Sequence, residues 1–235
     1  MHLEWGFFLR DIGDGETTYL SWLFSAWSWT LAVAGCAWVL ALLLGSVVGT
    51  LRTMQVTWVA RLANAWVELF RNIPLLVQIF LWYHVIPSLI PPLRDVPSFV
   101  LVVFGLGLFT SSRVAEQVRA GIQSLPRGQR HAGMALGLTT AQTYRYVLLP
   151  MAFRIVIPPL TSEAMNIIKN SSVAFAVSIS ELTLFAMQAQ EETSRGVEVY
   201  LAVTTLYIIT AMTINRLMAL IEKRVRVPGY VGGDR

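Results

Sequence analysis

The chain has 235 residues, of which 55% are hydrophobic and only 14% are charged, and its mean hydropathy is +0.58. Soluble domains carry about 25% charged residues, so this composition excludes a soluble globular protein and indicates an all-α integral membrane protein. The net charge of +4 suits contact with anionic lipid headgroups or with an acidic partner, and nucleic acid is not expected as a partner because the positive residues flank apolar runs. No P-loop pattern occurs, so any ATP hydrolysis must come from another chain.

The first 16 residues are acidic, with four carboxylates against Arg10. They lack the basic start and apolar core of a secretory signal, so we expect this segment to be retained, on the periplasmic side or at the interface. Trp5, Phe7 and Phe8 are predicted to lie among lipid headgroups. Residues 17–226 form the predicted membrane domain, and residues 227–235 form a cytoplasmic tail.

Five membrane-spanning helices follow in the predicted domain. The first run, Thr17 to Leu51, carries no charged residue and exceeds the roughly 20 residues that cross the hydrocarbon core. Pro74 should kink the second span, and residues 86–98, which contain four prolines, are predicted to be a loop. The predicted later spans are residues 64–87, residues 96–112 continuing into Arg119, residues 160–182 and residues 199–215.

A compact helical elbow is predicted over residues 127–150, between the third and fourth spans. Gly128 to Leu136 has the pattern of a short helix, and Gly137 can end it because glycine adopts the left-handed cap conformation. Thr139 to Gln142 fits a capping box that starts a second short helix, and Pro150 should limit how far that helix runs. Four arginines and no carboxylate lie between Arg127 and Pro159, so the elbow offers another protein a rigid basic surface.

The elbow resembles the cytoplasmic loop of ATP-binding-cassette importer permeases. The matching residues are Ala132-Gly133-Met134-Ala135-Leu136-Gly137, then Val147-Leu148-Leu149-Pro150. The resemblance implies the MetI-like type I importer permease fold with cytoplasmic coupling helices. It also implies that the contacts to the ATPase come from His131, Ala132, Gly133, Leu136, Gly137 and Pro150. His131 stands where the family usually has Glu, and Gly133 where it usually has Ala.

Three further stretches resemble the polar amino-acid branch of this family, and most of all its glutamate/aspartate permeases. Glu68 to Gln78 looks like the second-helix signature, and Arg113 to Arg119 like the third-helix signature, with Arg113 where Tyr is usual. Glu163, with Lys169 to Ser172 and then Glu181-Leu182, looks like the signature of the fourth span.

Charged side chains inside these spans are candidate substrate ligands, because charge in a membrane is costly and normally faces a cavity or a partner. Helical spacing places Arg113, Glu116 and Gln117 on one face. Lys169, Arg71 or Arg113 can hold a substrate carboxylate, and Glu163 or Glu116 can hold its ammonium. A second substrate carboxylate needs a second cation, which Arg113 supplies. The predicted substrate-binding residues are Asn72, Arg113, Glu116, Glu163, Lys169 and Asn170.

Purely structural pairings remain open for the same charges. Arg71 and Glu68 are three residues apart and can neutralise each other near the interface. Arg113 can instead pair with Glu116 at the interface. A pair between Glu163 and Lys169 can serve only to hold helices together.

Arginine and lysine set the orientation of the chain in the membrane. Positive residues concentrate after the first span, in the elbow and at the C-terminal end, whereas Arg10, Arg94 and Arg195 are the positive residues of the opposite side. We therefore expect a multi-pass protein of a bacterial inner membrane, with its N-terminus periplasmic and its elbow and C-terminus cytoplasmic.

The resemblance implies a non-catalytic permease subunit of an amino-acid importer. Its partners would be a cytoplasmic ATPase dimer, a second permease chain, expected to be a paralogue, and a periplasmic amino-acid-binding protein. No cofactor is expected in this chain, since ATP and Mg²⁺ would bind the ATPase. Two other classes remain open on the sequence alone: an ATP-independent membrane carrier and a non-transporting membrane assembly subunit.

Overall fold

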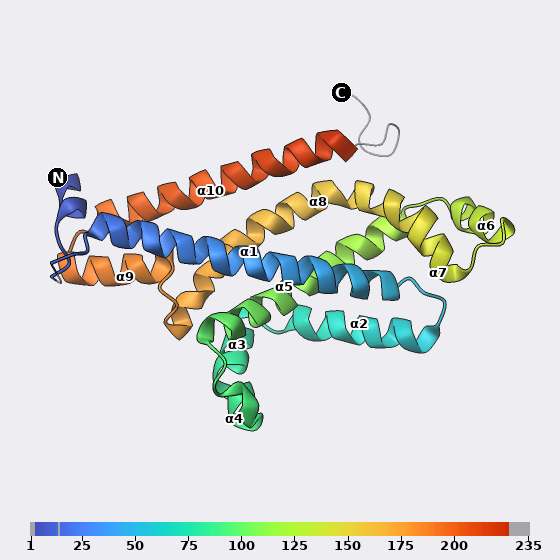
Figure 1. The fold of residues 1–235 in the computed structure, drawn as a ribbon, viewed down its shortest axis with the longest axis horizontal. Helices are drawn as coiled ribbons and strands as arrows, with labels where there is room; N and C mark the ends of the chain where they lie inside the picture. Colours follow the sequence, from blue (N-terminus) through green and yellow to red (C-terminus); the bar gives the residue numbers. More distant parts are fainter. Residues whose placement is uncertain (1–2, 14, 226–235) are drawn as a thin grey trace. The chain divides into compact units, whose positions relative to one another are not determined.

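The structure is a computed structural model that describes residues 3–13 and 15–225 (Figure 1). The predicted tail, residues 227–235, lies outside the described residues. The chain divides into two compact units, and all but one of the boundaries between them fall within helices, the exception being the junction of Ile73 and Pro74. Unit 1 comprises Met1–Trp38, Pro74–Gly107 and Asn166–Thr213, and unit 2 comprises Val39–Ile73, Leu108–Met165 and Ile214–Arg235.

Helices make up nearly all of the described secondary structure, as the apolar composition predicts. The α-helices are α1 (Tyr19–Leu51), α2 (Thr57–Asn72), α3 (Leu75–Phe80), α4 (Ile86–Leu89), α5 (Ser98–Gln123), α6 (Arg127–Ala135), α7 (Thr140–Thr143), α8 (Leu149–Asn170), α9 (Leu182–Thr193) and α10 (Gly196–Val225). Short 3₁₀ helices cover Trp5–Leu9, Pro91–Leu93 and Ser171–Val177, and π-helical turns cover Leu81–Val85 and Tyr144–Leu148.

Four helical stretches of the described chain are long and apolar enough to cross a membrane, or five if the broken pair of α2 with α3 and α4 is one span. The four are Tyr19–Leu51, Ser98–Gln123, Thr140–Val177 and Gly196–Val225. The predicted five spans agree with the higher count. The bounds predicted for the fourth span, residues 160–182, are wrong, because that helical stretch begins at Thr140 and has ended by Val177.

The error in the fourth span has its cause in the prolines. Pro150 was predicted to limit the second elbow helix, but it is the second residue of α8, and Pro158 and Pro159 lie inside the same helix. A π-turn comes just before Pro150, in which the N–H of Leu149 donates to the carbonyl of Tyr144. This wider turn shifts the pattern of backbone hydrogen bonds at the point where Pro150 has no N–H to donate.

The break predicted at Pro74 is confirmed, since α2 ends at Asn72 and α3 begins at Leu75. The second span nevertheless starts earlier than predicted, at Thr57. The loop predicted for residues 86–98 is wrong in part, because α4 and the 3₁₀ helix Pro91–Leu93 lie there. Their prolines occupy first-turn positions, where a missing N–H costs no helical hydrogen bond.

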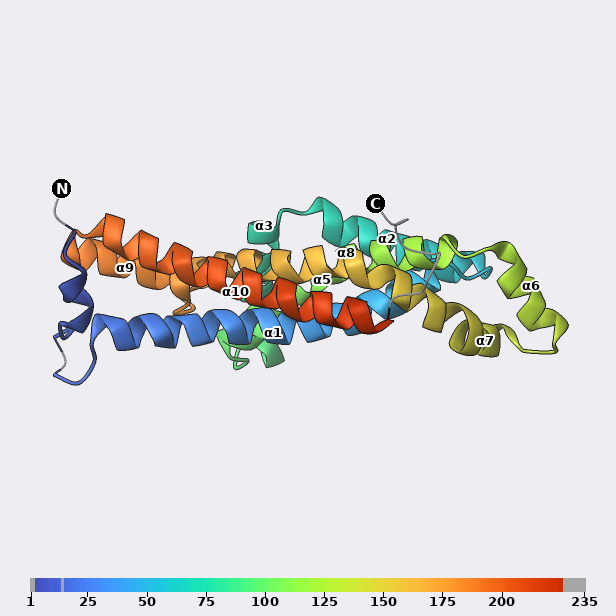
Figure 2. The ribbon, with the colours of Figure 1, turned by 90° about the horizontal axis from the view of Figure 1, so that it is seen from above.

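The N-terminal segment packs against the helix ends of unit 1 (Figures 1 and 2). Phe7 and Phe8 were predicted to lie among lipid headgroups, but their side chains are buried in a core with Tyr19 and Phe185, while Trp5 stays exposed. The segment folds back because burying two phenylalanines contributes several kcal/mol, about 1.5–3 each. The short 3₁₀ helix Trp5–Leu9 sets both rings on its inner side.

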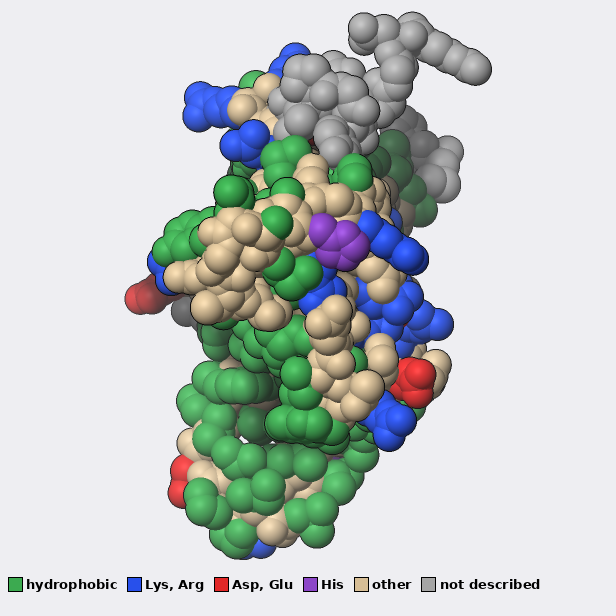
Figure 3. All heavy atoms as spheres, turned by 90° about the vertical axis from the view of Figure 1, so that its right-hand side faces the viewer, with side chains coloured by type: hydrophobic (Ala, Val, Ile, Leu, Met, Phe, Trp, Pro, Cys, Tyr) green, Lys and Arg blue, Asp and Glu red, His purple; other side chains and the backbone are tan. Residues whose placement is uncertain are grey.

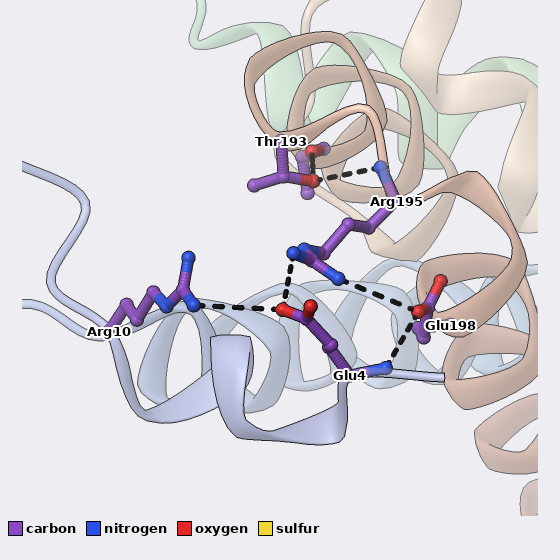
Figure 4. A network of polar contacts seen from close by, with 6 residues as sticks. Glu4, Arg10, Thr193, Arg195 and Glu198 are labelled. Atoms are coloured by element: carbon purple, nitrogen blue, oxygen red, sulfur yellow. Dashed lines mark hydrogen bonds and ion pairs between the residues drawn. The ribbon is translucent and has the colours of Figure 1, made fainter. Parts of the chain in front are cut away.

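Ion pairs fasten the same N-terminal segment to the start of α10 (Figure 4). The carboxylate of Glu4 lies 2.5 Å from the Arg195 guanidinium and 3.7 Å from that of Arg10. The backbone N–H of Glu4 donates to Glu198 at 3.0 Å. Aromatic burial and these polar contacts together hold residues that sequence reasoning treated as a peripheral segment.

A buried carboxylate caps α9, also in unit 1. Glu181 accepts hydrogen bonds from the backbone N–H groups of Thr183 and Leu184 at 2.9 and 3.0 Å, and from the hydroxyl of Tyr207 at 3.1 Å. Burial raises the pKa of this carboxyl, and the hydrogen bonds oppose that rise. The cap explains where α9 begins after the 3₁₀ helix Ser171–Val177.

Close helix contact at glycine organises unit 2. A Cβ added to Gly45 of α1 would lie 2.6 Å from the Cβ of Val114 in α5, and one added to Gly49 would lie 2.7 Å from the carbonyl oxygen of Ala115. A Cβ at Gly121 of α5 would lie 2.2 Å from Val156 of α8. Small residues therefore bring three helices close enough for their side chains to meet.

We predict that Gly45→Ala destabilises the protein by about 1–3 kcal/mol, because overpacking forces α1 away from α5. Gly35→Ala is the matched control on the same helix, since a Cβ at Gly35 meets nothing within 4 Å; it should be neutral or slightly stabilising. Thermal unfolding in detergent measures both. Equal melting temperatures for the two variants would contradict the close crossing.

Candidate functional site

A two-point ion pair joins α5 to α8 within unit 2. The Nε of Arg113 donates to Oε2 of Glu163 at 2.6 Å, and its Nη2 donates to Oε1 at 3.0 Å. The Glu163 side chain is only 6% exposed, whereas that of Arg113 is 41% exposed. A carboxylate this deeply buried needs its cation, and the arginine presents its remaining donors to the adjoining cavity.

Glu116, one helical turn along α5, is surrounded by three further arginines. Its carboxylate lies 2.8 Å from Arg52 and 3.6 Å from Arg71, and 3.9 Å from Arg119 on its own helix. Arg52 also donates from Nε to the side-chain oxygen of Asn64 at 2.7 Å. Glu116 thus gathers cations from the end of α1, from α2 and from α5.

Both carboxylates, together with Arg71 and Arg113, line one cavity of about 170 Å³, which is room for several water molecules. Its lining residues are Arg71, Arg113, Glu116, Gln117 and Glu163. Four guanidinium groups surround two carboxylates in this cluster, so it carries a surplus of positive charge. The cavity itself is lined by two arginines and two glutamates, and the surplus comes from Arg52 and Arg119 on Glu116. The lining arginines can bind an anionic group, and the carboxylates can hold an ammonium.

Three of the six predicted substrate-binding residues meet at this cavity, namely Arg113, Glu116 and Glu163. Asn72 belongs to the same unit, but it is exposed at the end of α2 and does not line the cavity. Lys169, which is exposed, and Asn170 belong to unit 1. The roles of Asn72, Lys169 and Asn170 stay predictions.

The structural pairings that the sequence left open are replaced by others. Arg71 approaches Glu116 and not Glu68, and Arg113 bonds Glu163 and not Glu116.

Sequence reasoning missed Arg52, whose side chain is only 7% exposed and makes the shortest contact to Glu116. No spacing rule could have found it, because its partner lies on another helix.

The elbow has the predicted local structure. Gly137 adopts a φ of +81° after α6, and the N–H of Leu138 donates to the carbonyl of Gly133 at 3.2 Å. The capping box is present in both directions, with Thr139 accepting from the N–H of Gln142 and Gln142 accepting from that of Thr139. Two short helices therefore meet at a turn whose backbone is fixed at every position.

Packing inside the elbow accounts for Gly133, which stands where Ala is usual. Gly133 is buried, and a Cβ placed on it would lie 3.0 Å from Cγ2 of Thr143 and 3.2 Å from its Oγ1. Thr143 thus occupies the space that an alanine methyl group would fill. The departure at this position keeps the contact between α6 and the helix after Thr139 close.

The outer face of the elbow exposes apolar side chains beside positive charge. Leu136 is 82% exposed and Met134 is 40% exposed, and His131 and Ala132 are exposed too. Figure 3, which faces this end of unit 2, shows Lys and Arg side chains gathered near it. An exposed leucine on a rigid basic turn suits a protein partner with an apolar pocket and acidic groups around it.

Comparison with known proteins gives a consistent result. Residues 41–227 match the family described as "Binding-protein-dependent transport system inner membrane component". The chain is 44% identical to the glutamate/aspartate import permease protein GltJ of Escherichia coli (strain K12), over 98% of both chains. It is 30% identical to the glutamine transport system permease protein GlnP of the same strain, over 86% of this chain and 89% of that protein.

Solved structures agree with these sequence matches. The crystal structure of an amino acid ABC transporter with histidines is 30% identical, with a TM-score of 0.76 over 88% of this chain and 95% of that one. An inward-facing structure of the MetNI methionine ABC transporter is 22% identical, with a TM-score of 0.77 over 88% and 98% of the two chains, and it shares the fold. The predicted MetI-like fold is confirmed.

We predict that Glu163→Gln lowers the free energy of unfolding by about 1–3 kcal/mol, because it leaves Arg113 without its carboxylate. Glu68→Gln is the control, since Glu68 is exposed and forms no ion pair among the described residues. Thermal unfolding of both variants at one detergent concentration provides the measurement. If Glu163→Gln were as stable as Glu68→Gln, the ion pair between Arg113 and Glu163 would not stabilise the fold.

Proposed function

The chain belongs to the inner-membrane components of binding-protein-dependent transport systems, and on that premise we propose that it conducts glutamate and aspartate into the cell. It is a non-catalytic, multi-pass permease subunit of an ABC importer for amino acids. Membership of this family rules out the ATP-independent carrier and the assembly subunit. The observation that carries the acidic substrate is the arginine surplus around Glu116 and Glu163.

The pair of Arg113 and Glu163 is the proposed point of substrate contact. An amino acid carries a carboxylate and an ammonium, so it can insert into this pair and take each charge as a partner. Arg113 would exchange the carboxylate of Glu163 for that of the substrate, and Glu163 would take the ammonium. No charge is left alone in the exchange, and this matters because an unpaired buried charge is strongly destabilising.

An acidic amino acid brings a second carboxylate, which the exchange alone leaves unpaired. Arg71 lines the same cavity, and its side chain is 60% exposed while it lies 3.6 Å from Glu116. This longer contact makes Arg71 the most available cation for that second group. Asn72, Lys169 and Asn170 complete the proposed set of ligands on the family resemblance.

The elbow is the proposed contact with the ATPase. The apolar side chain of Leu136 would seat in a cleft of the ATPase, and His131, Ala132 and Gly133 would lie along the same contact. Movement of the ATPase subunits would then turn α6 and the helix that runs into Pro150 as one body. The fixed turn at Gly137 supports this proposal, because a flexible link would dissipate the motion.

The rest of the assembly is proposed from the distribution of positive charge and from the family. The elbow and the C-terminus would face the cytoplasm and the N-terminus the periplasm, in line with the distribution of arginine and lysine. A periplasmic amino-acid-binding protein would deliver the substrate on the N-terminal side. A second permease chain, proposed to be a paralogue, would complete the path.

We predict that Arg113→Tyr lowers glutamate uptake by at least tenfold, because it removes one of the two proposed cations, Arg113 and Arg71. The affinity for glutamate should fall more than the affinity for glutamine. Uptake into vesicles holding the complete transporter, with both amino acids in competition, measures the selectivity. Arg61→Gln is the control, since Arg61 is exposed and lies outside the cavity. Unchanged selectivity in Arg113→Tyr would remove Arg113 from the site.

We predict that Gly137→Ala weakens the coupling of ATP hydrolysis to uptake, because alanine is strained by about 1 kcal/mol at positive φ. Gly128→Ala is the matched control in the same elbow, where the added methyl group meets nothing and φ is not positive. The ratio of amino acid transported to ATP hydrolysed should fall only in Gly137→Ala. An equal ratio in the two variants would show that the turn does not transmit the motion.

A further inference from the structure

A second cavity of unit 2, of about 330 Å³, lies where α5 ends and α6 begins. Its polar lining includes Gln123, the last residue of α5, and the two arginines of the first turn of α6, Arg127 and Arg130. Its apolar lining comes from Ile122, Leu125 and Leu148. It shares no lining residue with the cavity of Glu116 and Glu163.

The two arginines of this cavity lack carboxylate partners. No Asp or Glu occurs in the sequence between Glu116 and Glu163, and neither arginine forms an ion pair among the described residues. The Nη2 atom of Arg130 is buried without a hydrogen-bond acceptor within the described chain. A buried guanidinium nitrogen with no acceptor can donate to a water or to an anion, and two arginines without carboxylate partners at one cavity favour the anion.

Tyr144 gives the cavity a fixed wall. Its hydroxyl donates to the carbonyl of Thr53 at 2.8 Å, just beyond the end of α1. The guanidinium carbon of Arg130 lies 6.0 Å from the centre of the Tyr144 ring, which restrains the arginine. The arginine is therefore held at the cavity, although nothing in the described chain accepts from its buried nitrogen.

The position of the cavity favours a lipid over a soluble anion. Gln123 ends α5 and Thr53 lies just beyond α1, and both helices are long and apolar enough to cross a membrane; we therefore take the cavity to lie at headgroup level. Apolar residues line it beside the arginines and suit a glycerol backbone and the start of an acyl chain. Two unpaired cations favour a headgroup with net negative charge over a zwitterionic one, whose ammonium they would repel.

We propose that this cavity binds the phosphate of an anionic phospholipid between Arg127 and Arg130, at the base of the elbow. The lipid would neutralise the first turn of α6 and fix that helix to the membrane end of α5. Since α6 is the first half of the proposed contact with the ATPase, anionic lipid would stiffen the elbow from the membrane side. The lipid site is separate from the transport cavity and can be tested without transport.

The test is native mass spectrometry of the delipidated permease–ATPase complex, titrated with phosphatidylglycerol, with phosphatidylcholine and with inorganic phosphate. We expect one phosphatidylglycerol per chain to be retained, with at least fivefold weaker retention in the double variant Arg127→Gln/Arg130→Gln. The matched control is Lys223→Gln/Arg224→Gln, which removes two exposed charges from the end of α10 and should retain the lipid. The same spectra show whether each variant still holds its ATPase, so misfolding is distinguished from lost binding.

A charge-conserving variant, Arg127→Lys/Arg130→Lys, should keep most of the retention and guards against a purely structural effect of the glutamines. Equal retention of phosphatidylcholine, or an equal loss in the α10 control, would overturn the proposal, because the lipid would then bind by diffuse contact. If the complex bound inorganic phosphate at millimolar concentration and retained no phosphatidylglycerol, the site would belong to a free anion and the proposal would be overturned. If the complex kept its ATPase but retained no phosphatidylglycerol at any concentration, the proposal would be overturned, and a carboxylate of the ATPase would be the candidate acceptor.

Discussion

A carboxylate buried in a membrane-spanning helix persists as a charge only beside a cation, and this constraint governs the centre of unit 2. Glu163 of α8 is almost fully buried, and Arg113 of α5 meets both of its oxygens. Removing Arg113 leaves a buried carboxylate that its surroundings cannot solvate. The pair can open only if something else supplies both charges, and a zwitterionic amino acid does so. In the proposed mechanism, stability and specificity therefore depend on the same two side chains.

Glu116, the second carboxylate of the cluster, is also held by arginines. Glu116 holds Arg52 tightly and Arg71 and Arg119 more loosely, so the cluster contains one fixed cation and others that can turn toward a ligand. The glycine contacts of α1, α5 and α8 keep these helices close enough for the pairs to form. The ion pairs therefore depend on the close approach of the helices that the glycines allow.

Local features were predictable from the sequence, and contacts distant in the chain were not. The turn at Gly137, the capping box at Thr139 and the break at Pro74 each depend on a few adjacent residues, and each is present. The common face of Arg113 and Glu116 followed from helical spacing. The pairing of Glu116 with Arg52 joins different helices, and no spacing rule reports it. Phe7 and Phe8 were misplaced for the same reason, because their burial depends on residues almost 180 positions away.

The prolines of α8 show a different limit. Single-residue rules treat Pro150, Pro158 and Pro159 as helix ends, but membrane helices tolerate proline where a wider turn or a neighbouring helix satisfies the freed groups. The π-turn at Tyr144–Leu148 is such a device, and no sequence signal marked it. The fourth span was therefore predicted too late in the chain, although its charged residues were recognised.

The most direct test of this account is a structure of the complete transporter, with ATPase and binding protein, solved with glutamate bound in the membrane domain. We expect that Arg113 has exchanged Glu163 for a carboxylate of glutamate, and that the Glu163 carboxylate lies within hydrogen-bond distance of the substrate ammonium. A structure in which glutamate is bound elsewhere while Arg113 and Glu163 remain paired would contradict it.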